Sequence, residues 1–205
     1  MIKLLFLQRF MEGNTKKIIQ ALTYLASKQP DKKLGFMKAY KLLWLADRYH
    51  LRQYGRTVSG DSYYAMQYGM VPTDAKHLLD GEGTILNTPE DYLGLYIKVL
   101  PNHHFKAIQD PDMMEFSVSD QEVLDKIHEV YGGMSANDLS SISHGFPEWK
   151  AYEKLIKSVG TKSSYPVNPD LFFEKTESDE SGLFSNDSEE LLSLTKELFH
   201  QYNRV

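Results

Sequence analysis

Residues 38–72 constrain the fold of this chain more than any other stretch, because a long apolar pattern is interrupted there by regularly placed charges. At 100° per residue, the angular step of an α-helix, apolar side chains cover most of the circumference. A helix with this pattern is usually buried at the centre of a domain. The sequence therefore predicts a central buried helix, which ends at Gly55 in the usual position of a C-terminal glycine.

The basic residues of this helix fall in one narrow strip that comprises Lys38, Lys41, Arg48 and Arg52. We expect the strip to be the wet face of the helix, with side-chain stems along apolar surface and charged heads in water. It could instead pair with an acidic segment, either on another protein or in this chain's own tail. Lys41, Arg48 and Arg52 are therefore candidate partner-binding residues. Phosphate contact is a further reading, but no helix-turn-helix signature accompanies the strip, so a nucleic-acid partner is not expected.

Asp47 and His50 lie on the apolar side of the same helix, three residues apart. A charge in such a place must be paired or hydrogen-bonded. We therefore predict a structural polar network of Asp47, His50 and Asp61, in which Asp61 serves as a turn or cap residue. The alternative is a metal-dependent or hydrolytic enzyme built on these three side chains, for which an Asp/His pair at this spacing is a weak signal.

The segment after the helix is aromatic and is predicted to be extended from residue 62 to residue 68. Its tyrosines and methionine are candidate contacts for a protein partner, because such side chains make adaptable anchors in interfaces. The same residues also suit a core position. The candidates are Tyr63, Tyr64, Met66 and Tyr68. Pro72 then favours the start of a helix at residues 73–79.

The remaining pattern predicts a mainly α fold, a compact helical domain around the central buried helix, with a small antiparallel β element at about residues 92–118. Strands are expected at 92–99, 105–108 and 113–118. A capping box at Ser119 and Glu122 and a weaker one at Ser135 and Asp138 each predict a helix start.

Four segments follow from composition: an N-terminal extension at 1–13, the main domain at 14–159, a linker at 160–187 and an amphipathic helix at 188–205. Residues 174–190 hold seven acidic residues and one lysine, so the rest of the chain is near neutral although the net charge is −5. We expect the acidic linker to be poorly ordered. The final helix either folds into a partner's groove or docks on the body.

No catalytic residue, cofactor or metal ligand set is predicted. The chain has no cysteine, and its histidines form no ligand array. His144 follows a serine-rich helix but has no nucleophile elbow beside it, so we interpret it as a helix end. The apolar run near the N-terminus is too short to span a bilayer and lacks a cleavage site. We therefore expect a cytoplasmic protein with no membrane partner.

Three ordered blocks resemble the Panacea family, also described as SocA-like antitoxin or GepA-like phage-associated domains. The blocks are KLLWLADRYHLRQYGR at 41–56, GDSYYAMQYGMVP at 60–72 and SVSDQEVLDKIHEVYGGMSANDLSSISHGFPEWK at 117–150. Met70 stands where the family's YGPVP turn usually has proline. The resemblance implies a mostly helical antitoxin of a two-gene toxin–antitoxin system, whose partner is a co-encoded toxin bound by direct contact. One branch of the family delivers its toxin to a protease, so a protease or chaperone is an alternative partner. The family has no established catalytic residues.

Overall fold

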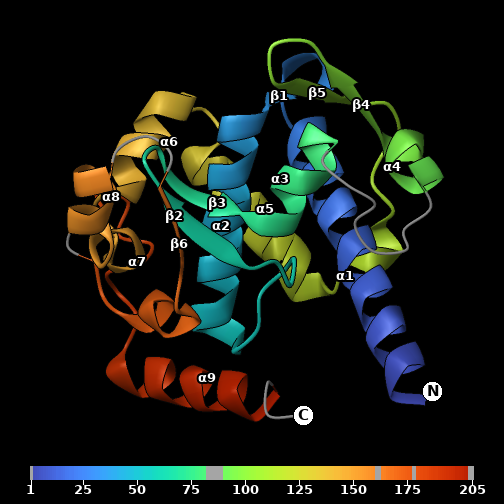
Figure 1. Cartoon of the computed structure of the whole chain (residues 1–205). Coiled ribbons are helices and arrows are strands. Elements are labelled where there is room, and N and C mark those ends of the chain that lie inside the picture. Colours follow the sequence, from blue (N-terminus) through green and yellow to red (C-terminus); the bar gives the residue numbers. More distant parts are fainter. Residues whose placement is uncertain (1, 82–89, 160–162, 177–178, 203–205) are drawn as a thin grey trace.

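The computed structural model describes residues 2–81, 90–159, 163–176 and 179–202, with side chains described from residue 14 onward except at 90 and 91. The fold is mainly α, and two small antiparallel sheets pack beside the helices (Figure 1). The central element is α2 (Phe36–Tyr54), which other helices and one of the sheets surround. The predicted fold class is confirmed.

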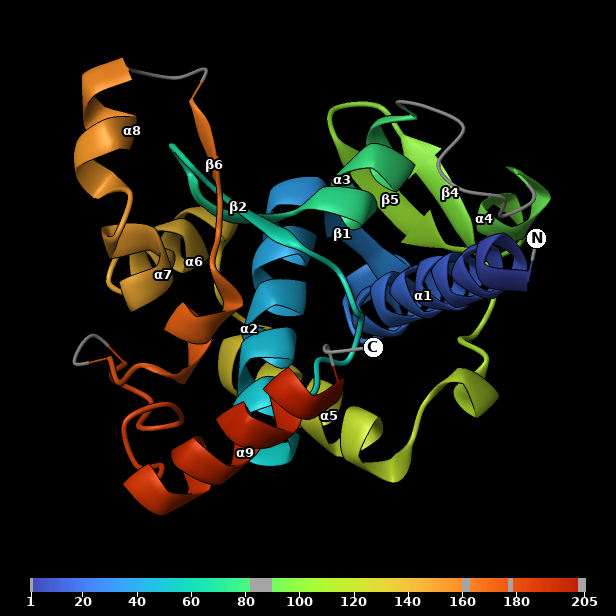
Figure 2. The same ribbon diagram turned by 60° about the horizontal axis from the view of Figure 1, so that its bottom comes forward.

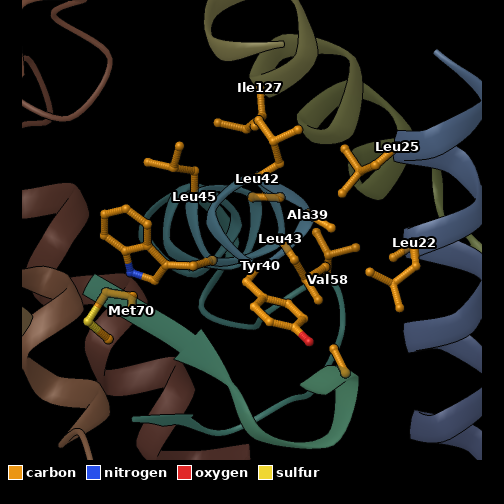
Figure 3. Close-up of a cluster of buried hydrophobic side chains, with 14 of the residues drawn as sticks. Leu22, Leu25, Ala39, Tyr40, Leu42, Leu43, Leu45, Val58, Met70 and Ile127 are labelled. Carbon is orange, nitrogen blue, oxygen red and sulfur yellow. The ribbon is translucent and has the colours of Figure 1, made fainter. Parts of the chain in front are cut away.

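Helix α2 is buried because apolar side chains occupy nearly all of its faces. In Figure 3, Leu42 points toward Ile127 of α5 (Val118–Tyr131), and Leu22 of α1 (Ile2–Ser27) lies on another side. Met70 closes a third side from below. The helix ends as predicted at Gly55, which has φ +70° and donates its N–H to Leu51 O at 2.9 Å.

The first sheet has the strand order β1–β5–β4, from β1 (Lys33–Gly35), β5 (His104–Ala107) and β4 (Ile97–Leu100). The predicted hairpin is present, but two details of the prediction are wrong. Helix α4 (Glu90–Tyr96) occupies the first half of the predicted strand 92–99. The third strand is β1, whereas residues 113–115 form the 3-10 turn η2 (Met113–Glu115). Sequence periodicity could not find a strand of three residues.

The second sheet has the order β3–β2–β6, from β3 (Gly69–Pro72), β2 (Tyr63–Met66) and β6 (Ser164–Pro166). Strands β2 and β3 form a tight hairpin around residues 67 and 68, so the segment predicted to be extended at 62–68 is a strand at 63–66 and turns at 67 and 68. Gly69 has φ +94°, and a Cβ there would overlap the hydroxyl of Ser143. Only glycine fits that position. Helix α3 (Thr73–Asp80) follows Pro72, as expected.

Two capping boxes begin α5 and α6 (Ala136–Ser143). The second is at the predicted residues, Ser135 and Asp138. The first is displaced from the prediction, because Ser117 is the cap and Asp120 is its reciprocal partner. The pairs Ser117/Asp120 and Ser119/Glu122 have the same spacing in the sequence. In the structure, the buried residue Asp120 is the one that forms the capping box. The short helices α7 (Pro147–Lys150) and α8 (Glu153–Val159) follow α6.

For the linker residues that the structure describes, the prediction of poor order is wrong. They include β6 and the 3-10 helix η3 (Pro169–Phe173), and they bury Phe172, Phe173 and Phe184. Although the segment is acidic overall, these three phenylalanines supply enough buried apolar area to hold it on the body. The final helix, α9 (Glu189–Tyr202), lies across the C-terminal end of α2 (Figure 2).

Helix α1 begins at Ile2, so one helix runs through the predicted extension at 1–13 into the predicted main domain. The side chains of the predicted extension 1–13 lie outside the described residues. None of the helices that the structure describes is both long and apolar enough to cross a membrane.

Candidate functional site: the polar contacts of the central helix

Asp47 is the centre of the first polar cluster on α2. Its carboxylate accepts hydrogen bonds from the backbone N–H and the hydroxyl of Ser59 and from the hydroxyl of Tyr63, which donates at 2.7 Å. Burial raises the pKa of Asp47, and the bonds from Ser59 and Tyr63 oppose that rise. This cluster ties α2 to the loop that follows it.

Asp61 joins the same cluster through Ser59, whose hydroxyl accepts the Asp61 N–H at 3.1 Å. The Asp61 carboxylate accepts the backbone N–H groups of Asp74 and Ala75, both at 2.9 Å, and so caps α3 from a distance. Burial raises the pKa of Asp61 to about 7. The predicted cap role is therefore correct, although the helix that Asp61 caps is more than ten residues away in sequence.

His50 belongs to a second cluster, and it makes no bond to Asp47. One ring nitrogen lies 2.8 Å from Arg56 O, and the other lies 3.2 Å from the carboxylate of Asp120. Arg56 and Lys17 also donate to Asp120, each at 2.8 Å. Burial alone would raise the pKa of Asp120, but the hydrogen bonds from His50, Lys17 and the backbone of Ser117 hold that pKa far below its usual range. Asp47 and His50, which were predicted to share one network, thus belong to two separate ones.

Arg48 and Arg52 form the third group, and both are fully buried. Arg48 pairs with buried Glu148 at 2.9 Å, and the indole N–H of Trp44 donates to the same carboxylate oxygen at 3.0 Å. The Arg48 guanidinium also lies 4.8 Å from the ring centres of Phe146 and Phe184. Burial lowers the pKa of Arg48 to about 10, and Glu148 opposes that shift. The buried Arg48 guanidinium therefore belongs to the packing of the core, and a partner protein cannot reach it.

Arg52 holds the C-terminal segment on α2. It donates to Asp187 at 2.7 Å and to the backbone carbonyls of Phe172, Glu174 and Phe184. A guanidinium has five N–H donors in a rigid plane, which suits several acceptors at once. The sequence left several hypotheses open for the basic strip. The contacts of Arg52 match one of them, namely pairing with the acidic tail of this chain.

The prediction that the basic strip of α2 faces solvent is therefore wrong. Lys41, Arg48 and Arg52 are fully buried, and Lys38 is half-buried. Lys41 donates to Met70 O at 2.6 Å, and burial lowers the pKa of Lys41 to about 7. Angular position alone could not reveal that other segments cover this face. As candidate partner contacts these three residues would need the chain to open.

The candidate aromatic residues divide according to the alternation of a β-strand. Tyr63 is buried against Phe172 and bonds Asp47, whereas Tyr64 and Met66 are half-buried. Tyr68, in the hairpin turn, is 57% exposed. Of the four candidates, Tyr68 is therefore the most open to a partner, while Tyr64 and Met66 are open in part.

The central part of the chain matches a known protein family. The family model described as antitoxin SocA-like, Panacea domain, matches residues 40–150, which is just over half of the chain. The chain belongs to this family. Neither the curated proteins nor the solved structures give a match.

The Panacea match contains both partners of the buried pair Arg48 and Glu148, and it contains Asp47, His50, Asp61 and Asp120. Two charged partners lie outside the match, namely Lys17 on α1 and Asp187 before α9, and so do the backbone carbonyls that Arg52 binds. The Panacea segment thus supplies the central clusters, and the flanking segments close them.

A pocket of about 510 Å³ lies beside the loop that follows α2. Its polar lining includes Lys17, Arg56 and Asp61, and its far wall comes from Phe199 and Tyr202 of α9. Lys17 and Arg56 are already bound to Asp120. Among the residues that the structure describes, no three histidine or acidic side chains converge as a metal ligand set.

His144 ends α6, as predicted, and donates its backbone N–H to Ser140 O at 3.3 Å. Its ring stacks on Trp149 with 3.9 Å between centres, and burial lowers the pKa of His144. No group in the described part of the chain bonds its Nε2 atom. The Ser143 hydroxyl donates to Ser140 O instead, so the two residues form no serine–histidine couple.

Sequence reasoning missed Glu148 and Asp120, the two acids on which the buried networks depend. Glu148 stands in the PEWK segment next to a proline that opens a helix, where an acidic residue is expected on the surface. A buried arginine predicted on α2 would have demanded such a partner. Asp120 lay inside the predicted capping box but was not the residue assigned to it.

Proposed function

We propose that this Panacea-domain protein is the non-enzymatic antitoxin of a two-gene system, acting in the cytoplasm by direct protein–protein binding to a co-encoded toxin. The observation that carries the proposal is the family match over residues 40–150. Supporting it, the side chains considered for catalysis, Asp47, His50 and Asp61, all have structural partners. Each of the three side chains therefore has a structural role that accounts for its place in the interior.

The hairpin of β2 and β3 is the contact surface that the geometry favours. Tyr68 projects from its turn, while its backbone carbonyl accepts the hydroxyl of Ser140 at 2.8 Å. The fold thus fixes the backbone of this residue and leaves the ring available. A rigidly held tyrosine loses little entropy on binding and is a common hot spot.

Co-expression with the product of the neighbouring gene tests the proposal. We expect that product to be toxic alone, to be harmless with this chain, and to co-purify with it. Titrated expression separates binding from catalysis, because a binder must match the toxin in amount whereas an enzyme protects at a small fraction of it. Neutralisation without co-purification, or at substoichiometric levels, contradicts the proposal. A shortened toxin half-life would instead identify a protease adaptor.

Tyr68→Ala tests the contact surface. We expect it to weaken toxin binding by about tenfold or more, as truncation of a hot-spot tyrosine does. The matched control is Tyr202→Ala on α9, where tyrosine is 71% exposed. Equal affinities of the two variants would remove the hairpin from the interface and leave the antitoxin role standing.

A further inference from the structure

Three lysines form a row across the sheet β1–β5–β4. Lys33 of β1 is opposite Lys106 of β5, and Lys106 is opposite Lys98 of β4. Directly opposite residues share one face of a sheet, so the three side chains leave the same face, and all three are exposed. With strands about 4.8 Å apart, the row is about 10 Å long. The other face buries Leu34 and Phe105 in the core.

The lysine row is uncompensated within the part of the chain that the structure describes. Neither Lys33, Lys98 nor Lys106 forms an ion pair or side-chain hydrogen bond there. Their neighbour Lys32, in contrast, pairs with Asp110 at 2.7 Å. Like charges directly opposite each other destabilise a sheet. The free protein therefore bears a cost that an anionic partner would remove.

We propose that the lysine row docks an acidic helix of a protein partner; the inference rests on the proposed function for the identity of that partner, the toxin. Acidic side chains four residues apart on a helix lie about 5–6 Å from each other along one face. That spacing matches the distance between strands, so a helix lying across the strands meets each lysine with one carboxylate. The docking contributes charge complementarity and faster encounter.

The composition of the face favours an acidic protein over nucleic acid. Besides the lysines, the same side of these strands carries Gly35, Leu100 and His104. It lacks the arginine, tyrosine, phenylalanine and tryptophan that stack on bases and grip phosphates in nucleic-acid sites.

A peptide titration followed by amide NMR tests the docking directly. The probes are a capped helical peptide with glutamate at every fourth position, an isomer with its glutamates in one block, and a single-stranded oligonucleotide of equal charge. We expect the spaced peptide to shift the amides of β1, β5 and β4 and to bind more tightly than the other two. The triple variant Lys33→Gln/Lys98→Gln/Lys106→Gln should bind it about tenfold or more weakly, as lost charge pairs predict.

The control is Lys126→Gln, which removes one charge from a lysine that already pairs with Glu129 at 3.0 Å. It should leave peptide binding unchanged. Shifts elsewhere, equal binding by the triple variant, or tighter binding of the oligonucleotide would each overturn the inference. None of these results depends on the toxin. If the wild-type chain neutralises the toxin and the triple variant associates with it equally fast, the docking fails and the antitoxin role stands.

Discussion

On α2, Arg48 and Arg52 are fully buried and between them contact two carboxylates and several backbone carbonyls. On the sheet β1–β5–β4, by contrast, the lysine row is exposed and forms no ion pair with the residues that the structure describes. The two regions have the same sign of charge and similar side chains. They differ in solvation. A buried charge must be matched within the fold, while an exposed one can stay unmatched at small cost.

This difference indicates where function is to be sought. The contacts of Arg48 and Arg52 join segments one hundred or more residues apart in sequence and so determine which parts of the chain pack together. The lysine row joins nothing in the described part of the chain. Substitutions in the first region should change stability strongly and binding only through stability. Substitutions in the second should change binding while leaving the fold intact.

Glu148→Gln should have the largest effect, because it leaves the Arg48 guanidinium buried without a counter-charge. We expect a loss of about 3 kcal/mol in the free energy of unfolding, measured by urea denaturation at pH 7. Glu153→Gln is the control, since Glu153 pairs with Lys157 on the surface of α8. Equal losses for the two variants would contradict the contrast between buried and exposed charge.

Asp120→Asn should cost about 2 kcal/mol at pH 7, since three cationic or imidazole partners lose their carboxylate. Asp138→Asn is a close control, because Asp138 occupies the same capping-box position in α6 but is exposed. We expect it to cost about 0.5–1 kcal/mol.

The pH dependence of Asp120→Asn follows from the lowered pKa of Asp120. A carboxyl whose pKa is lower in the folded state stabilises the fold above its unfolded pKa of about 3.9, and that contribution fades as the pH falls below it. The difference between wild type and Asp120→Asn should therefore shrink between about pH 4 and pH 2. A constant difference would show that Asp120 acts by shape alone.

Lys41→Met should stabilise the protein, because Lys41 is buried without a carboxylate and its pKa falls to about 7. A lysine whose pKa is lower in the folded state makes stability rise with pH between that pKa and its unfolded value of about 10.4. Methionine removes this dependence, so we expect a gain of about 1 kcal/mol near pH 6 that disappears toward pH 10. Lys38→Met, at a half-buried and hydrogen-bonded lysine, should give no such gain.

The central helix, its glycine end and the extended conformation of residues 63–66 were predictable because each depends on neighbours in sequence. Periodicity, the left-handed preference of glycine and the alternation of a strand act over a few residues. The helix that Asp61 caps was not predictable in this way, because it begins twelve residues later in the chain.

The coverage of the basic strip could not be predicted, because it depends on contacts between distant segments. Arg52 is closed off by residues 172–187, whose acidic composition conceals three buried phenylalanines. The lysine row was equally hidden, since its register joins β1 to strands about seventy residues later in the chain. A strand of three residues carries too short a hydrophobic pattern to identify a partner so far along the chain.

Substitutions in the lysine row should have the smallest effects on stability, and Lys106→Gln the largest among them, with the most diagnostic sign. Lys106 is the middle of the row and has two like-charged neighbours, whereas Lys33 and Lys98 have one each. We expect Lys106→Gln to raise stability by about 0.5 kcal/mol and each outer variant by about half of that, with Lys126→Gln neutral or slightly destabilising. Thermal unfolding at low and high salt measures this, since added salt should screen the repulsion and erase the gain. A gain that persists in high salt would assign the effect to strand propensity, because charge repulsion between neighbouring strands cannot survive a Debye length shorter than their separation.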